Sequence, residues 1–319
     1  MSKSLTSSKL IASVKRRAQI PANQNTFKEE DFLAFANEEM QLGLVPSVLQ
    51  LHEDYFLWDI EVPLEESRSA YRIPYRAIGN KLRNVVYKDT NGNLYEMTRI
   101  GDDEKVDYNG GYTIGSGSAF RVKNNEIILE PNIKGVVTGS LVFTFYIRPN
   151  DLVLENETGK ITGIDRTNGV ITVSSFPTKF TAQEKYDFIE GQSPHTHLSI
   201  DVEILSVNSV QKSITLNPAS IPSDLQKGDY ICFAQETPVP QIPTDLHVVL
   251  AHRVAARCLE ASGDTQGLTN ANVKLQEFEQ KTQNVIDNRV EDAPLKVRSR
   301  HNTLRNGLVT RRASRRSMR

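Results

Sequence analysis

The sequence predicts an α+β protein in which helices from both chain ends form a base and a large antiparallel β domain is inserted between them. Apolar residues recur at helical spacing near both ends, whereas the middle of the chain alternates apolar and polar residues with period two. Asn-Gly dipeptides divide this middle part into hairpins. The expected domains are helices (1–58), a small barrel or sandwich (59–240), helices (241–292) and a basic tail (293–319).

The first expected helix has an apolar stripe formed by Leu10, Ile11, Val14 and Ala18, and it ends before Pro21. Such a stripe must be buried against another element. We therefore expect the N-terminal and C-terminal helices to pack together, with the chain leaving this helical base and returning to it.

The second expected helix begins near Thr26 and Glu29, which have the spacing of a capping box. It ends near Gly43 and Pro46, and the following stretch "SVLQLHEDYF" is compatible with a further short helix. Its apolar stripe consists of Phe32, Phe35, Ala36 and Met40.

Three hairpins are expected in the β domain. "LRNVVYKDTNGNLYEMTRI" turns at Asn91-Gly92 and "GKITGIDRTNGVITVSS" turns at Asn168-Gly169, where both central residues tolerate positive φ. "DVEILSVNSVQKSITLN" has a longer turn.

The last two hairpins indicate a weak internal duplication. Each is followed by a similar short motif, "KYDF" in the first case and "GDYI" in the second. The equivalent apolar residues share one offset of 43: Ile161 and Ile204, Ile164 and Val207, Ile171 and Ile214.

The third long helix is expected to begin at Thr244 or Asp245, either of which can cap it, and to end at Gly263. Its shared face consists of Leu246, Leu250 and Val254. A fourth helix over 264–290 has a stripe too short for a long coiled coil, so it should pack against another helix. That stripe consists of Leu268, Ala271, Leu275, Phe278 and Val285.

Charge divides the chain into an acidic body and a basic tail. Nine of the 38 Lys and Arg residues lie from Lys296 onward, and the last acid is Asp292. The remaining 29 bases face 39 acids, so residues 1–295 carry a formal charge of about −10. An acidic body argues against wrapping duplex DNA on the folded surface. The tail could be a docking peptide, which its apolar residues favour, a contact for DNA or RNA, or a passive extension.

Two cysteines imply no disulfide framework and fit a reducing cytoplasm. The longest apolar run, "GSLVFTFYI", is too short to cross a bilayer, so no membrane is expected as a partner. The basic, Ser-rich beginning could also be a transit peptide, but it runs directly into the next helix pattern.

No catalytic, metal or cofactor site is expected, and the chain is predicted not to be an enzyme. "YNGGYTIGSGSAF" lacks the setting of a phosphate loop and reads as a mobile, projecting loop. His195 and His197, with Asp201 as the nearest carboxylate, could share one face of a strand, but they are more simply structural or surface residues. Neither a G-x-S-x-G nor an H-E-x-x-H motif is present.

The most informative segment runs from the second helix into the first long strand: "FLAFANEEMQLGLVPSVLQLHEDYFLWDIEVPLEESRSAYRIPYRAIGNKLRNVVYKD". Pro74 fixes an extended backbone, and Arg76, Lys81 and Arg83 form a basic elbow in acidic surroundings. This segment resembles head–tail connector (adaptor, or portal-ring) proteins of short-tailed bacteriophages, the crAss-like group included.

The resemblance implies a non-enzymatic virion protein, assembled in the host cytoplasm, at the junction of portal and tail. About twelve copies would form a ring, with double-stranded DNA passing through its lumen without sequence-specific binding. Expected partners are the portal protein, adjacent tail or ring proteins, and further copies of the chain. Arg76, Lys81 and Arg83 would make ring or elbow contacts.

The resemblance also implies that a C-terminal extension reaches into the portal or a neighbouring subunit. Residues 296–319 could span about 80 Å when extended. The docking residues expected are Arg298, Arg300, Leu304, Arg305, Leu308, Arg311, Arg312, Arg315 and Arg316.

Two other functions stay open. The chain could bind nucleic acid through its tail, which a salt titration would reveal. It could also be a hydrolase or carbohydrate-binding module, although Trp58 is the single Trp available for an aromatic platform.

Overall fold

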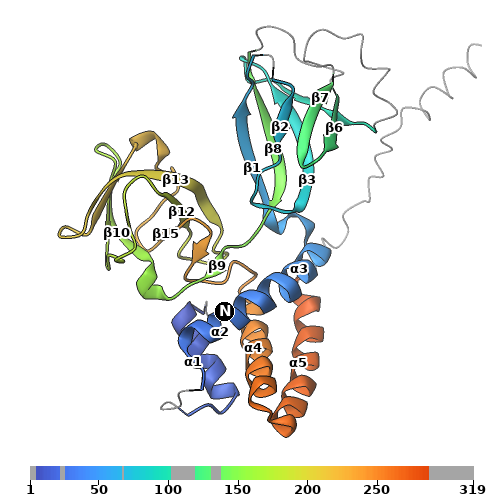
Figure 1. Ribbon diagram of the computed structural model, residues 1–319, viewed down its shortest axis with the longest axis vertical. Coiled ribbons are helices and arrows are strands. Elements are labelled where there is room, and N and C mark those ends of the chain that lie inside the picture. Colours follow the sequence, from blue (N-terminus) through green and yellow to red (C-terminus); the bar gives the residue numbers. More distant parts are fainter. Residues whose placement is uncertain (1–4, 22–25, 67, 102–118, 131–137, 287–319) are drawn as a thin grey trace, which may run out of the picture. The chain divides into compact units, whose positions relative to one another are not determined.

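The computed structural model describes residues 5–21, 26–66, 68–101, 119–130 and 138–286 (Figure 1). Helices at both ends of this range enclose antiparallel strands, which confirms the predicted α+β class. The Gly- and Ser-rich segment 108–118 and the basic tail lie outside the described residues.

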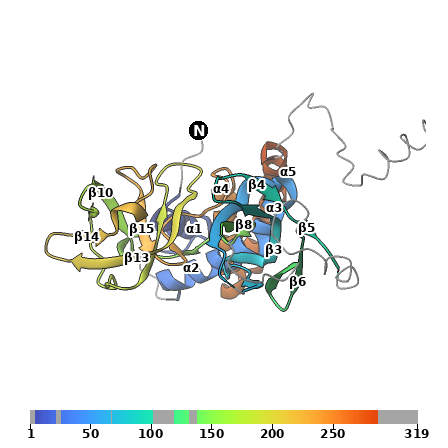
Figure 2. The same cartoon turned by 90° about the horizontal axis from the view of Figure 1, so that it is seen from above.

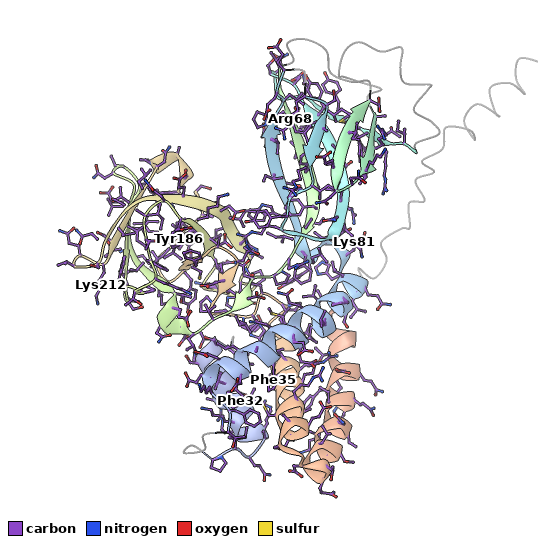
Figure 3. All side chains as sticks on the ribbon, viewed as in Figure 1. Phe32, Phe35, Arg68, Lys81, Tyr186 and Lys212 are labelled. Carbon is purple, nitrogen blue, oxygen red and sulfur yellow. The ribbon has the colours of Figure 1, made fainter. Side chains whose placement is uncertain are left out.

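The helical base consists of five α-helices: α1 (Ser7–Arg17), α2 (Glu29–Glu38), α3 (Val45–Leu51), α4 (Leu246–Ser262) and α5 (Thr265–Ile286). One hydrophobic cluster joins the two ends of the chain, with Leu10, Phe32 and Val48 packed together with Leu250 and Val254. The prediction that the N- and C-terminal helices pack together is therefore confirmed. Figure 3 shows Phe32 within this base.

The beginning of α2 differs from the predicted capping box. Lys28 occupies the N-cap position, and its backbone N–H donates to the Asp31 carboxylate at 2.7 Å. Thr26 and Glu29 have the right spacing for a capping box, but the helix begins two residues later than this pair requires. The reason is that Asp31 supplies the carboxylate for the first turn.

The helix also does not end at Gly43 and Pro46. A π-helical turn, η1 (Glu39–Leu44), connects α2 to α3 without a break. Pro46 lies in the first turn of α3, directly after the π-helical turn, where the helical hydrogen-bond pattern changes, and the Ser47 hydroxyl donates to Gly43 O at 3.0 Å. A Cβ at position 43 would lie 2.0 Å from Arg253 Nη1, so glycine allows close approach of α4.

The short helix predicted within "SVLQLHEDYF" is confirmed as α3, and a 3₁₀ turn, η2 (Glu53–Phe56), leads into the first strand. Gly263 adopts a left-handed conformation with φ 77° and ends α4 as predicted. Asp245 occupies the N-cap of α4 without a capping hydrogen bond from its side chain.

The first β module is a pair of four-stranded sheets. One contains β1 (Leu57–Pro63), β8 (Ser140–Ile147), β3 (Ala77–Lys88) and β4 (Leu94–Glu96), in that order. The other contains β2 (Ala70–Arg72), β7 (Glu126–Glu130), β6 (Ala119–Lys123) and β5 (Thr98–Arg99). Their core includes Val85, Ile127 and Phe143, and the hairpin predicted at Asn91-Gly92 is the turn between β3 and β4.

The second β module is a closed six-stranded barrel. Its order is β10 (Gly159–Asp165), β11 (Val170–Val173), β14 (Ser213–Leu216), β13 (His197–Asn208), β12 (Lys185–Ile189) and β15 (Tyr230–Phe233), which pairs again with β10. Two 3₁₀ turns, η4 (Glu155–Glu157) and η5 (Pro218–Ser220), flank its strands. Figure 3 labels Tyr186 within this barrel, where the side chain is fully buried.

The internal duplication is visible in the strand registers. Ile164 pairs with Ile171, and their counterparts at offset 43, Val207 and Ile214, pair with each other in the same way. Both hairpins also have a register shift at equivalent positions, before Gly163 and before Ser206. The barrel is thus built from two related three-stranded units, β10–β12 and β13–β15. Strands of one unit pair with strands of the other, as β11 does with β14 and β12 does with β13.

The β region contains two hydrophobic cores, although the sequence was interpreted as one β lobe. The chain enters and leaves the barrel at a short parallel pair, β9 (Asp151–Leu152) and β16 (Glu236–Thr237). Each module therefore closes its own core, and short connecting segments join the modules to the helical base.

Candidate functional site

A highly connected polar group in the described residues is Arg76, immediately before β3. Its guanidinium is 3% exposed, and its neighbours accept from all five N–H donors. Nη1 donates to Asp187 Oδ2 at 2.7 Å and to Asn150 Oδ1 at 3.0 Å. Nη2 donates to Asp187 Oδ1 and Asp201 Oδ1, both at 2.8 Å, and Nε donates to the Tyr75 hydroxyl at 3.2 Å.

Asp187 comes from β12 of the barrel and is completely buried. Besides the two Arg76 bonds, it accepts from Asn150 Nδ2 at 2.7 Å and from the backbone N–H groups of Asp201 and Gln235, both at 3.0 Å. A bidentate pair of this kind fixes both position and orientation. Asp187 therefore connects the segment before β3 to β13, through Asp201, and to the residues that follow β15, through Gln235.

Asn150 and Gln241 extend this network into the segments that flank the barrel. The backbone N–H of Asn150 donates to Gln241 Oε1 at 2.7 Å. His197 Nε2 lies 3.1 Å from Asn150 Oδ1, and its ring contacts Trp58 edge-on at 6.0 Å between centroids. Because desolvation by burial disfavours the charged imidazolium, the pKa of His197 is lowered to about 4.

The charges of this polar junction stabilise one another. Burial alone would lower the pKa of Arg76, but hydrogen bonds and the charge of Asp187 outweigh it and raise that pKa. Burial likewise opposes ionisation of Asp201, yet hydrogen bonds from Arg76 and Tyr75 lower its pKa. Arg76 and Asp201 are thus both held in their charged forms.

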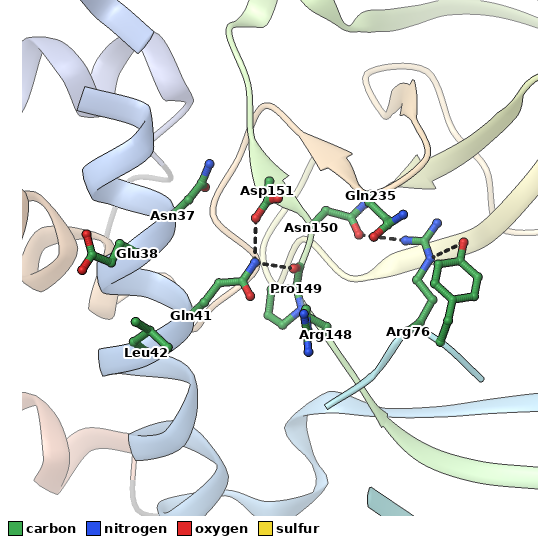
Figure 4. Close-up of a pocket in the computed structure, with 11 residues that line it drawn as sticks. Asn37, Glu38, Gln41, Leu42, Arg76, Arg148, Pro149, Asn150, Asp151 and Gln235 are labelled. Atoms are coloured by element: carbon green, nitrogen blue, oxygen red, sulfur yellow. Dashed lines mark hydrogen bonds between the residues drawn. The ribbon is translucent and has the colours of Figure 1, made fainter. Parts of the chain in front are cut away.

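A cleft of about 350 Å³ lies beside the junction, as Figure 4 shows. Gln41 of η1 crosses it and donates to Asp151 Oδ1 at 2.6 Å. Leu42 and Tyr75 line the cleft as exposed large side chains, and Arg148 and Glu38 contribute opposite charges. Since Arg76 and Asn150 are already saturated by protein partners, the arrangement holds segments together and offers few vacant donors to a ligand.

A second polar cluster connects the N-terminus to the segment before α4. His247 is buried, its Nδ1 accepts from the backbone N–H of Leu5 at 3.1 Å, and its Nε2 lies 3.0 Å from Pro240 O. The His195 ring stacks on it at 5.9 Å. Desolvation and the neighbouring His195 lower the pKa of His247 to about 4, so the neutral ring with its proton on Nε2 fits these contacts.

The two histidines considered as possible ligands are both buried in the barrel region. His195 lies in the turn before β13 with φ 62°, and His197 begins the strand, so the two are not on one regular strand face. Asp201 is bonded to Arg76 and Tyr75. Across the described ranges, no group of three or more His, Cys, Asp or Glu side chains could hold a metal ion.

The three basic residues of the predicted elbow have different environments. Arg76 makes an elbow contact within the chain and, with five occupied donors, is not available as a contact between ring subunits. Arg83 is partly exposed and pairs with Glu53 at 2.7 Å. Lys81 is exposed on β3, as Figure 3 shows.

The predicted docking residues lie outside the described part of the chain; they are Arg298, Arg300, Leu304, Arg305, Leu308, Arg311, Arg312, Arg315 and Arg316.

Sequence reasoning missed Asp187 and Asn150. One signal was present for Asp187, because offset 43 maps it onto Tyr230, a departure from the repeat pattern. Among the described helices, none is both long and apolar enough to cross a membrane.

No protein-family model matches this chain, and no curated protein is significantly similar to it. The residues and contacts described above are therefore the basis for a functional proposal.

Proposed function

We propose that this chain is a structural, non-enzymatic virion protein, a subunit of a ring that joins the capsid portal to the tail of a short-tailed bacteriophage. Double-stranded DNA would pass through the lumen, and the C-terminal tail would dock on the portal or on a neighbouring subunit. The observation that carries the proposal is the helical base, in which helices before and after the β modules in the sequence share one hydrophobic core. The family that residues 32–89 resemble implies this same organisation.

Ion pairs give the base the rigidity that a closed ring requires, because small errors in subunit angle accumulate around a ring. Arg253 of α4 pairs with Glu279 of α5 at 2.6 Å, and Arg257 pairs with Glu39 of η1 at 2.7 Å. These bonds connect α4 to α5, the next helix, and to η1, which is distant in the sequence.

The outer face of α5 supports a role in subunit contact. Val273 is 65% exposed there; Glu277 on the same face is charged, but within two turns on either side the other exposed residues of this face are uncharged. They are Gln266, Thr269, Asn270, Gln276 and Gln280. Interface centres are depleted in charge relative to the remaining surface, so this stripe is a candidate ring contact. A permanent ring interface should bury roughly 2,000 Å² or more.

The tail supports docking through two kinds of residue. Its arginines can form bidentate pairs with acidic partners, and Leu304, Leu308 and Val309 supply apolar anchors that a purely electrostatic arm would not need. The body, with its formal charge of about −10, repels DNA in a lumen rather than binding it.

Deletion of residues 296–319 tests the docking role. The variant should yield a folded protein with unchanged circular dichroism, but particles carrying it should not hold portal and tail together in negative-stain images. A control in which Arg298, Arg300 and Arg305 are replaced by Lys keeps the charge and removes bidentate pairing. Particles that join normally without residues 296–319 would refute docking by the tail.

A second candidate function is nucleic-acid binding through the tail, which nine bases and no acid favour. In that case, binding of the full chain to DNA should weaken steeply as salt rises, with a log–log slope proportional to the number of phosphates neutralised. A flat salt dependence would exclude this alternative.

A further inference from the structure

A shallow groove of about 680 Å³ runs along β13 of the barrel. One wall consists of Leu198–Glu203 in the first half of this strand, and the other consists of residues 219–223, after β14. β14 pairs with β13 only from Ile204 onward. The first half of β13 has no β14 neighbour on that side, and the groove lies there. Figure 2 shows β13 and β14 at the outer part of the barrel.

The groove is a difference between the two halves of the duplicated barrel. At this place the second unit has two extra residues: "FPTKF" (176–180) corresponds to "IPSDL" (221–225), and the bond from Phe180 N to Pro177 O at 3.2 Å matches that from Leu225 N to Pro222 O at 3.3 Å. In the first unit the Phe176 and Phe180 rings pack on each other at 5.7 Å, and Phe180 also packs on Tyr186 at 5.0 Å. Ile221 and Leu225 are buried in the barrel core in place of the aromatic pair, and the small side chains of Ala219, Ser220 and Ser223 are exposed around this longer turn, in the wall of the groove.

The backbone diverges at the same place. In the first unit, Ser174 N donates to Lys160 O at 2.8 Å, which extends the hairpin by one bond. The counterpart of Ser174 is Asn217, whose side chain instead accepts from Ala219 N at 3.1 Å and turns the chain into η5. The hairpin of the second unit therefore opens one residue earlier, and this opening forms the groove.

The groove has the chemistry of a site for a basic, partly apolar strand. Leu198 and Ile200 are half-buried in its wall, and its charged lining residues, among those that the structure describes, are the acids Asp201 and Glu203. Glu203 is exposed, and one Asp201 oxygen is bonded to Arg76 and Tyr75. An extended peptide can add to a strand edge through main-chain bonds while its side chains enter neighbouring pockets.

We propose that this groove binds residues 296–319 of a neighbouring copy of the chain as an added β-strand. The inference rests on the proposed function and specifies the partner, the next subunit, together with the surface that receives the tail. The tail has nine bases and no acid, which complements a groove with two acids. Leu304, Leu308 and Val309 fit the apolar wall, and the arginines between them can reach Asp201 and Glu203.

The reach of the tail is sufficient for a second copy. Residues 287–295 between α5 and the tail span roughly 30 Å when extended, and residues 296–319 add about 80 Å. Such head-to-tail exchange of an arm is heterologous and can therefore close into a ring. Phosphate ligands are disfavoured in the groove because both acids would repel them.

Disulfide trapping between full-length chains tests the proposal. One protein carries Ser220→Cys in the groove, the other carries Leu304→Cys in the tail, and the native Cys232 and Cys258 are buried. After mixing and mild oxidation, we expect a disulfide-linked pair at these two sites, identified by peptide mass spectrometry. The matched control is Ser174→Cys, the exposed position in the first unit, which should give at least about tenfold less product, corresponding to about 1.4 kcal/mol.

Two variants distinguish specific binding of the tail in the groove from cross-linking by random collision. Ala219→Phe with Ser223→Phe places two large rings at exposed positions that line the groove and should abolish the cross-link. If that variant fails to fold, Glu203→Lys on the exposed surface should reduce the cross-link strongly, whereas Glu126→Lys on β7 should not change it. Raising salt from about 0.1 M to about 1 M should also reduce it, because exposed charges are then screened.

Equal products at Ser220 and Ser174 would overturn the proposal, and so would a cross-link that forms only within a chain carrying both cysteines. Should the groove cross-link fail while deletion of residues 296–319 still separates portal from tail, the proposed function stands and the groove is refuted as its receptor. If deletion has no effect on particles, the proposed function itself fails.

Discussion

Arg76 and Asp187, 111 residues apart in the sequence, form a buried bidentate ion pair with N–O distances of 2.7 and 2.8 Å. Arg76 precedes a strand of the first β module, and Asp187 belongs to the barrel. Their pairing therefore connects the two β modules, whose hydrophobic cores are distinct clusters.

Removing either partner of this pair should destabilise the protein strongly. Asp187→Asn or Arg76→Met leaves the other charge buried without its counter-charge, and the free energy of unfolding should fall by about 3–5 kcal/mol. Arg76→Lys should also destabilise, because an ammonium has three donors where five acceptors are placed. Urea denaturation measures the loss.

The matched control is Arg83→Met, which removes an ion pair with Glu53 whose side chains are 39% and 65% exposed. Its cost should be at most about 1 kcal/mol. If Asp187→Asn costs no more than Arg83→Met, the junction does not stabilise the fold.

Acid should weaken the fold through its buried histidines. The pKa values of His197 and His247 are lowered to about 4, whereas the unfolded chain titrates near 6.5. Between these values the unfolded state binds more protons, so stability rises with pH: it is complete above about pH 6.5 and is lost as pH falls toward 4. Unfolding curves at pH 5 and pH 7 should differ in midpoint.

His247→Gln isolates one of these groups. The variant cannot become a buried cation, so its stability should depend less steeply on pH between 4 and 6.5, even if it is less stable at pH 7. His52→Gln, a half-buried position on the surface of the base, provides the comparison. A slope unchanged by His247→Gln would show that His247 does not titrate in this window.

The two Asn-Gly turns should respond differently to alanine. Gly92 and Gly169 both have positive φ, 84° and 68°. A Cβ at position 92 would meet no atom within 4 Å, whereas one at 169 would lie 2.2 Å from Leu216 O, a backbone atom. Gly92→Ala should thus cost about 1–2 kcal/mol from backbone strain alone, and Gly169→Ala should cost more. Thermal denaturation of the pair would decide, and equal costs would contradict the close contact at Gly169.

Both cysteines should resist alkylation in the native state. Burial raises the pKa of the Cys258 thiol to about 11 and that of Cys232 well above its usual value, so little thiolate is present. Iodoacetamide should label neither until the protein is unfolded with urea. Rapid native labelling would indicate that the barrel or the base opens locally.

Local signals in the sequence predicted several features correctly. Positive φ favours glycine, and Gly92 and Gly169 have it, so the Asn-Gly dipeptides predicted the hairpins at residues 91–92 and 168–169, although Asn91 and Asn168 themselves do not adopt positive φ. The offset of 43 predicted the repeat, because equivalent positions in a duplicated barrel need the same apolar side chains. Gly263 predicted the end of α4 for the same conformational reason.

The features that were missed depend on contacts distant in sequence. Continuation of the helix through Gly43 depends on α4, where the Arg253 side chain fills the place of a Cβ. The partners of Arg76 come from segments at positions 150, 187 and 201, and no spacing rule connects them. The sequence showed a basic elbow, but it did not show that its first residue, Arg76, is buried and bonded to other segments of the chain.

The parallel pair of β9 and β16 has a mechanical consequence. Glu236 and Thr237 lie beside Asp151 and Leu152, so the strand that enters the barrel and the strand that leaves it run in the same direction. Tension on the barrel would act along both strands. It would load the hydrogen bonds between them at the same time. A pulling force on the barrel would therefore be distributed over two chain crossings instead of one.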